Sequence, residues 1–113
     1  MGYEYEFTNV PTELFRTLGD PTRRAIFEQL VHHGEQNVRA LTDHAGVSQP
    51  AVSKHLNVLK QAGLVQERPS GRTVHYTADP RGLAPLLDWL DLYASFWRSR
   101  FDRLETLLER LEE

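Results

Sequence analysis

Two helical segments joined by a very short connection are the feature that most constrains this fold. Asn37 can cap a first short helix, and Gly46 can end it by adopting a left-handed backbone conformation. Ser48 can then cap a second helix, which Gly63 ends. Because only Val47 separates Gly46 from Ser48, the two helices must meet across a very tight turn. This arrangement is typical of a helix-turn-helix unit.

Two further helices are predicted before this unit. A short helix over residues 11–18 presents one apolar face and stops at Gly19. A second helix over about residues 21–33 follows, because Asp20 suits the N-cap and Pro21 suits the first helical position.

The helical spacing of apolar residues ends after the second helix of the helix-turn-helix unit. Residues 64–68 and 73–77 form β-rich runs, and Pro69, Ser70 and Gly71 between them supply turn chemistry. These runs predict a small hairpin. A long helix then runs from about Leu83 towards the C-terminus.

The predicted order is helix, helix, helix, tight turn, helix, hairpin and long helix. It indicates a mainly α fold with a small β-hairpin (α+β), that is, a winged helix-turn-helix with one appended helix. A length of 113 residues is that of one domain. We therefore expect residues 1–113 to form a single domain, with a winged helix-turn-helix core over 11–82 and a C-terminal dimerisation helix over 83–113.

The charge of the chain is unevenly distributed. The formal net charge is −3, which by itself argues against binding nucleic acid. Residues 39–76, however, hold five basic and two acidic residues, a net charge of +3, whereas residues 1–38 and 77–113 each carry −3. A basic centre between acidic flanks indicates one surface that faces an anion, although chance clustering would give the same distribution.

The helix after the tight turn has the character of a DNA-reading helix. Val52, Leu56 and Leu59 form its apolar face, and the opposite face carries short or polar side chains that can lie deep in a major groove. No acidic residue occurs between positions 47 and 65, whereas an ordinary surface helix commonly carries Glu–Lys pairs on its wet face. In the hairpin, Arg68 and Arg72 bracket the turn, which places two guanidinium groups at its tip. The predicted DNA contacts are Ser48, Gln49, Pro50, Ser53, Lys54, Asn57, Arg68, Ser70 and Arg72.

These residues match a known family. The run from 48 to 65, followed by Arg68, Gly71-Arg72 and Tyr76, closely resembles the ArsR (ArsR/SmtB) family of bacterial winged-helix repressors, and residues 18–24 resemble that family's entry into its second helix. The resemblance in sequence covers about residues 11–82. The terminal helix resembles that of the family only in its position and its role. It implies a homodimer that binds an inverted-repeat operator of double-stranded DNA and blocks transcription until an inducer weakens binding.

The resemblance also implies individual roles. Gln49, Ser53 and Lys54 occupy positions that contact bases in such proteins, and Arg68 and Arg72 fall in the wing. Many members of the family sense metals through a cysteine pair or through Asp and His ligands on the last helix. This sequence has no cysteine, and residues 83–113 contain no histidine. We therefore expect no metal site and no cofactor.

An unbroken apolar seam marks the terminal helix. Its members are Leu83, Leu87, Leu90, Ala94, Trp97, Phe101, Leu104, Leu108 and Leu111. Their spacing alternates between four and three residues, as in a heptad that requires a partner helix. The predicted dimer interface consists of Leu14, Phe15, Leu90, Ala94, Trp97, Phe101, Leu104 and Leu108. The aromatic residues of this helix leave open a second interpretation, a pocket for an unidentified small-molecule inducer.

Other functional classes find less support in the sequence. No Gly-rich phosphate loop, nucleophile elbow or acid pair indicates an enzyme, so no catalytic residue is predicted. A winged-helix module that binds protein would be expected to expose larger apolar anchors on the second helix of the unit. No stretch approaches the roughly 18 apolar residues of a membrane span, and residues 1–11 do not resemble a secretory signal. We therefore expect a cytoplasmic protein without a membrane partner.

Overall fold

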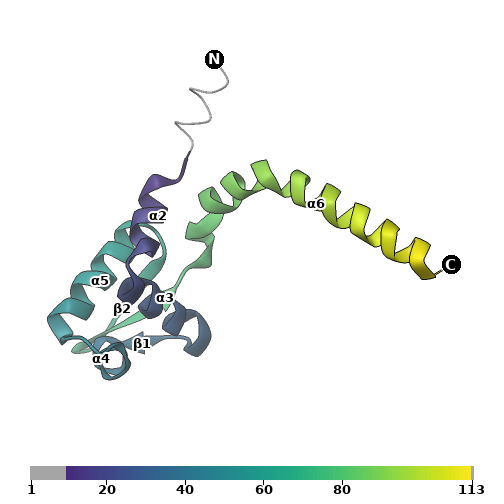
Figure 1. The fold of residues 1–113 in the computed structure, drawn as a ribbon. Helices are drawn as coiled ribbons and strands as arrows, with labels where there is room; N and C mark the ends of the chain where they lie inside the picture. Colours follow the sequence, from purple (N-terminus) through teal and green to yellow (C-terminus); the bar gives the residue numbers. More distant parts are fainter. Residues whose placement is uncertain (1–9, 113) are drawn as a thin grey trace, which may run out of the picture. The chain divides into compact units, whose positions relative to one another are not determined.

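The computed structural model describes residues 10–112 (Figure 1). Its elements, in order, are α2 (Thr12–Gly19), α3 (Pro21–His33), β1 (Gln36–Asn37), α4 (Val38–Ala45), α5 (Gln49–Gln61), β2 (Val65–Ser70), β3 (Thr73–Ala78), the short 3-10 helix η1 (Pro80–Leu83) and α6 (Ala84–Glu112). The predicted fold class, mainly helical with a small antiparallel sheet and a long C-terminal helix, is confirmed. The expectation of no secretory signal falls largely on residues 1–9, which lie outside the described residues.

The chain divides into two compact units. Residues Pro11–Ala84 form one of them, and α6 from Pro85 onward belongs to the other. The first unit corresponds closely to the predicted winged helix-turn-helix core over 11–82. That residues 1–113 behave as a single domain stays a prediction.

The side chains predicted to cap the helices do so. Asn37 Oδ1 accepts a hydrogen bond from the backbone N–H three residues later at 2.8 Å, Ser48 Oγ does the same at 3.3 Å, and Asp20 Oδ1 at 3.0 Å. Each bond satisfies one of the N–H groups that a helix leaves unpaired in its first turn. Gly46 adopts a φ of 70°, a left-handed conformation, so α4 ends and the chain can turn directly into α5.

The core of the first unit is built around one face of α5. Val52, Leu56 and Leu59 are completely buried, with an exposed fraction of 0% each. They lie among apolar side chains from α3, α4 and the start of the sheet. The other buried apolar side chains of this unit are Leu14, Ile26, Phe27, Leu30, Leu41, Leu64 and Val65. Burial on this scale fixes the rotation of α5 about its own axis, because any other rotation would expose these leucines to water.

The predicted hairpin is part of a three-stranded antiparallel sheet in the order β1-β3-β2. The added strand, β1, is only two residues long and pairs with β3 at His75 and Tyr76. A run this short carries no alternation of polar and apolar residues, so β1 could not be predicted from its residues.

The turn of the hairpin is tighter than predicted. Pro69 and Ser70 belong to β2, where they pair with Val74 and Thr73, and the turn itself consists of Gly71 and Arg72. Assigning Pro69 and Ser70 to the turn was therefore wrong. Proline is tolerated here because β2 is an edge strand of the sheet, where one missing N–H donor costs little.

The chain leaves the sheet through η1, which packs closely against the end of α5. A β-carbon added at Gly82 would overlap the backbone carbonyl of Gly63, the residue that follows α5. The backbone N–H of Asp79 also donates to the Leu64 carbonyl oxygen at 2.7 Å. The predicted start of the long helix at about Leu83 is shifted by one residue, since Leu83 ends η1 and α6 begins at Ala84.

This close approach predicts that Gly82→Ala destabilises the protein. The new methyl group must displace the backbone of the turn after α5, so the free energy of unfolding should fall by about 1–3 kcal/mol. Urea unfolding measures the change. Gly19→Ala is the matched control, because a β-carbon there meets no atom within 4 Å and lies in a helical residue. Equal stability of the two variants would contradict the packing described here.

Candidate nucleic-acid interface

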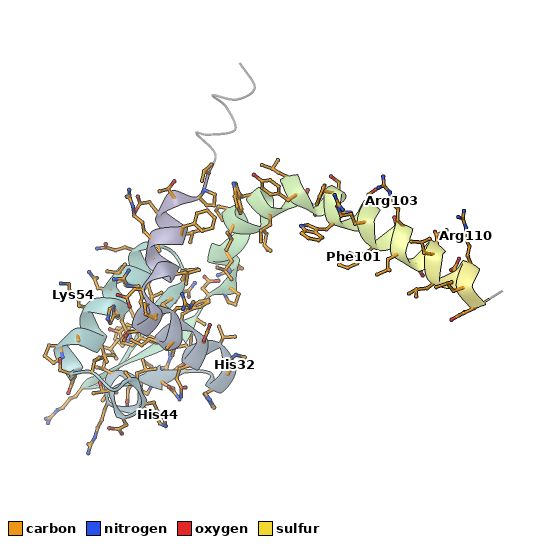
Figure 2. All side chains as sticks on the ribbon, viewed as in Figure 1. His32, His44, Lys54, Phe101, Arg103 and Arg110 are labelled. Atoms are coloured by element: carbon orange, nitrogen blue, oxygen red, sulfur yellow. The ribbon has the colours of Figure 1, made fainter. Side chains whose placement is uncertain are left out.

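The face of α5 opposite the core gathers the predicted base-contacting residues. All of the predicted contacts on this helix are exposed, while the apolar face behind them is completely buried. Figure 2 shows the Lys54 side chain on the outer side of the helix. The structure therefore brings together the following side chains on one exposed surface: Ser48, Gln49, Pro50, Ser53, Lys54 and Asn57.

This surface, formed by the exposed side chains of residues 48–57 and called the reading face below, is suited chemically to a major groove. Gln49 and Asn57 each offer an amide that can donate to and accept from base edges, and Ser53 is short enough to allow close approach. Within the described residues, no salt bridge engages the Lys54 ammonium group, so it is available to a phosphate or a guanine.

Of the two wing arginines, only Arg72 lies at the tip. Arg72 is exposed in the turn, next to Gly71, and forms no ion pair within residues 10–112. Ser70, the last residue of β2, is also exposed, and its carbonyl oxygen accepts a hydrogen bond from Thr73 Oγ1 at 2.9 Å. These two predicted contacts are therefore positioned to reach a ligand that lies beyond the tip.

Arg68 lies elsewhere, and its predicted placement at the tip was wrong. It pairs across the strands with His75, two pairs below the end of the ladder, and its guanidinium group forms an ion pair with Glu35. Hydrogen bonding to Glu35 raises the pKa of Arg68, and the same bond lowers the pKa of Glu35. This pair could not be predicted from a local pattern, because 33 residues separate its members.

A second polar cluster secures the base of the wing. The Asp79 carboxylate accepts hydrogen bonds from Arg81 Nε at 2.8 Å and from Gln66 Nε2 at 2.7 Å, which ties β2 to η1. These bonds, with that from Arg81 contributing most, lower the pKa of Asp79 to about 2. On the neighbouring part of β2, Glu67 pairs with Lys60 Nζ at 2.6 Å, so Lys60 is partly neutralised.

The histidines do not form a metal site in the part of the chain that the structure describes. Residues 10–112 contain no group of three or more His, Asp or Glu side chains that could hold an ion. His55 Nδ1 accepts a hydrogen bond from Arg23 Nε at 3.3 Å, and His44 Nδ1 donates to the Ala40 carbonyl at 3.1 Å, so both rings have structural partners. The arrangement offers no ligand set for zinc.

The apolar side chains of α6 are mostly exposed in the single chain. Phe101 is 63% exposed and Leu104 is 52% exposed, and Figure 2 shows Phe101 on the side of α6 opposite Arg103 and Arg110. The other predicted interface residues of this helix, Leu90, Ala94, Trp97 and Leu108, are exposed or partly exposed. Despite the length of α6, no described helix is apolar enough over a sufficient length to cross a membrane.

The two interface residues predicted on α2 differ from each other. Phe15 is 40% exposed, but Leu14 is only 7% exposed and belongs to the core. Leu14 therefore packs mainly within its own unit, and its place in a dimer interface stays a prediction. The sequence pattern places both residues on one apolar face, but it does not distinguish the buried centre of that face, where Leu14 lies, from its exposed edge, where Phe15 lies.

A capped helix pair, an exposed reading face free of acidic side chains and a wing with an arginine at its tip define a winged helix-turn-helix protein. Comparison with known proteins identifies the particular family. Residues 20–67 match the family described as "Bacterial regulatory protein, arsR family". The chain belongs to this family.

Individual relatives agree with this assignment. The HTH-type transcriptional regulator Rv2034 of Mycobacterium tuberculosis is 48% identical over 77% of this chain and 78% of that protein. The arsenical resistance operon repressor of Escherichia coli is 32% identical over 90% of this chain and 85% of its own length. The crystal structure of BigR, a transcriptional repressor from Xylella fastidiosa, is 30% identical with a TM-score of 0.62, covering 85% of this chain and 96% of that one. The prediction of a DNA-binding transcriptional regulator, and not an enzyme, is confirmed.

The cluster at the base of the wing predicts how stability depends on pH. Because the folded-state pKa of Asp79 lies below its ordinary value of 3.8, its carboxylate stabilises the fold above about pH 4, and this contribution is lost as the pH falls towards about 2. Asp79→Asn should lower the free energy of unfolding at pH 7 and flatten its dependence on pH between 4 and 2.

Urea unfolding at several pH values measures this dependence. Asp43→Asn is the control for net charge, because Asp43 is exposed and its carboxylate has no hydrogen bond within residues 10–112. An unchanged pH dependence in Asp79→Asn would show that the cluster does not stabilise the fold.

Proposed function

We propose that this protein is a homodimeric repressor that binds an inverted-repeat operator through the reading face and the wing tip. The observation that carries the proposal is the contrast between the two faces of α5, one fully buried and one exposed, polar and free of acidic residues. The names of its relatives support repression, since the Escherichia coli relative is a repressor of an arsenical resistance operon.

In this proposal, α5 lies in the major groove. Gln49 and Asn57 hydrogen-bond to base edges, Ser53 allows close approach of the backbone, and Lys54 contacts guanine or phosphate. Ser48, the N-cap of α5, and Pro50, in its first turn, would lie beside the sugar-phosphate backbone. At the wing, Arg72 contacts phosphates or enters the adjacent minor groove.

Dimerisation takes place through α6. Its exposed apolar side chains would be an aggregation hazard in a monomer, and the four-three spacing of its seam fits the face of a second helix. A twofold dimer presents two reading faces, so it addresses half-sites about one helical turn of DNA apart or a multiple of that distance. Loss of one subunit removes half of the contacts and therefore abolishes specific binding first.

Release from DNA by an unidentified small-molecule inducer is the second part of the proposal. Trp89 and Tyr93 meet edge to face with ring centroids 5.1 Å apart, and Phe96 and Trp97 do the same at 5.5 Å. Such rings suit an organic ligand better than a metal ion, and the sequence supplies no thiolate. Because operator DNA lies in the cytoplasm of a bacterial cell, we also propose a cytoplasmic location.

An alternative is a winged-helix module that binds another protein and not DNA. The reading face does not favour a protein-binding module, because its exposed residues are small or polar and include no large apolar anchor. Selection of bound fragments from a mixed genomic library decides between the two. The proposed function predicts enrichment of fragments that share an inverted repeat, with binding that weakens as salt rises. Recovery of no DNA at low salt would contradict it.

The division of roles between α5 and the wing is testable by substitution. Gln49→Ala and Ser53→Ala should each weaken operator binding by about 1–3 kcal/mol and leave binding to random DNA nearly unchanged. Arg72→Ala should weaken binding to both and lower the slope of log affinity against log salt by about one unit. Titration of labelled duplexes at several salt concentrations measures both effects. If the α5 variants keep their operator preference, the reading face is assigned wrongly.

A charge placed in the α6 seam should separate the dimer. Leu104→Asp would bury an unpaired carboxylate between the two helices, so a folded monomer that has lost operator binding is expected. Ser99→Asp adds the same charge away from the seam and should remain dimeric. Sedimentation equilibrium and operator titration together report the outcome. A Leu104→Asp dimer with intact operator affinity would rule out this interface.

A further inference from the structure

We propose that Glu35 is a positioning residue for the wing: its carboxylate holds Arg68 against the body of the domain, directs the hairpin and leaves Arg72 to contact DNA. The inference rests on the proposed function, since it concerns how the wing is presented to the duplex. It assigns a role to an acidic residue that lies outside the helix-turn-helix and carries a charge that DNA repels.

The geometry joins three parts of the chain at one carboxylate. Glu35 lies in the connection between α3 and β1. Its two oxygens face the guanidinium group of Arg68 on β2, with Arg68 Nε 3.5 Å from Oε2 and Arg68 Nη2 in closer contact with Oε1. His75 Nδ1 on β3 lies 3.5 Å from Oε1. One side chain outside the hairpin therefore contacts both of its strands.

This contact lies where the wing leaves the sheet. β1 pairs with β3 only at His75 and Tyr76, so the row that contains Arg68 and His75 is the last one with three strands. Beyond it, residues 69–74 form a two-stranded ribbon. Such a ribbon is marginally stable by itself, so its direction depends on the row from which it emerges. Glu35 contacts both residues of that row, Arg68 and His75.

The Glu35–Arg68 pair affects the direction of the hairpin and the charge that Arg68 offers to DNA more than it affects the free energy of folding. The Arg68 side chain is 60% exposed and that of Glu35 is 33% exposed, and ion pairs this accessible contribute little to the free energy of folding. The Glu35 carboxylate does neutralise the charge of Arg68, so Arg68 attracts phosphate less strongly. Within residues 10–112, Glu35 and Arg72 share no hydrogen bond or ion pair, so any effect of Glu35 on Arg72 must pass through the position of the wing.

The experiment is a double-mutant cycle between two residues that do not touch. Glu35→Gln should remain folded and should bind random DNA more tightly, because it frees the charge of Arg68, while the ratio of operator to random affinity falls by roughly threefold to tenfold. In this background Arg72→Ala should cost much less operator affinity than it does in the unaltered protein. This dependence of the Arg72→Ala effect on residue 35 is an energetic coupling between two residues that do not touch, and a change of charge alone is not expected to produce it.

Glu67→Gln is the matched control. It removes another exposed carboxylate from the wing, the partner of Lys60, and so changes net charge by the same amount. It should strengthen binding to random DNA in a similar way but keep both the operator preference and the full effect of Arg72→Ala. If Glu35→Gln and Glu67→Gln behave alike in these two measurements, the proposal is overturned.

Two further results keep the outcomes separate. Arg68→Met removes the other member of the pair and should reproduce the lost operator preference without tighter binding to random DNA; an unchanged preference would overturn the proposal even if Glu35→Gln fails to fold. If Arg72→Ala has no effect on any DNA in the unaltered protein, the proposed wing contact fails, and the positioning role of Glu35 fails with it. Loss of operator preference in Gln49→Ala tests the proposed function independently of the wing.

Discussion

Burial of one face of α5 is the constraint on which the rest of this structure depends. Val52, Leu56 and Leu59 are removed entirely from water, and each would lose about 1.5–3 kcal/mol of hydrophobic stabilisation if exposed. The helix can therefore present only one other face to solvent, and that face carries amide, hydroxyl and ammonium groups. The apolar core thus determines which side chains are offered to DNA.

Ion pairs refine this surface by selecting which cations remain available. Lys60 is partnered by Glu67 and Arg68 by Glu35, whereas within the described residues Lys54 and Arg72 have no acidic partner. Within residues 10–112, the cations of the basic central segment 39–76 that form no ion pair are therefore Arg39 on α4, Lys54 on α5 and Arg72 at the wing tip. A chain with a net charge of −3 can in this way present a local surface that attracts phosphates while the rest of the molecule repels them.

The features that local sequence encodes were predictable. The caps at Asp20, Asn37 and Ser48 and the left-handed Gly46 depend only on nearby residues, and all were anticipated. The features that were missed depend on contacts between distant parts of the chain. β1 exists because β3 passes beside it, and the Glu35–Arg68 pair joins residues 33 positions apart. Neither leaves a periodic pattern in the sequence, and β1 is shorter than the run that such a pattern needs.

DNA binding through α5 requires that residues 48–57 form the surface that contacts the duplex. The most direct measurement is the change in backbone amide chemical shifts of the ¹⁵N-labelled protein as selected operator DNA is added. We expect the largest changes over residues 48–57 and 70–73, with the amides at the C-terminal end of α3 unaffected. Changes concentrated on α3 and α4, with residues 48–57 unperturbed, would contradict the assignment of α5 as the helix that reads DNA.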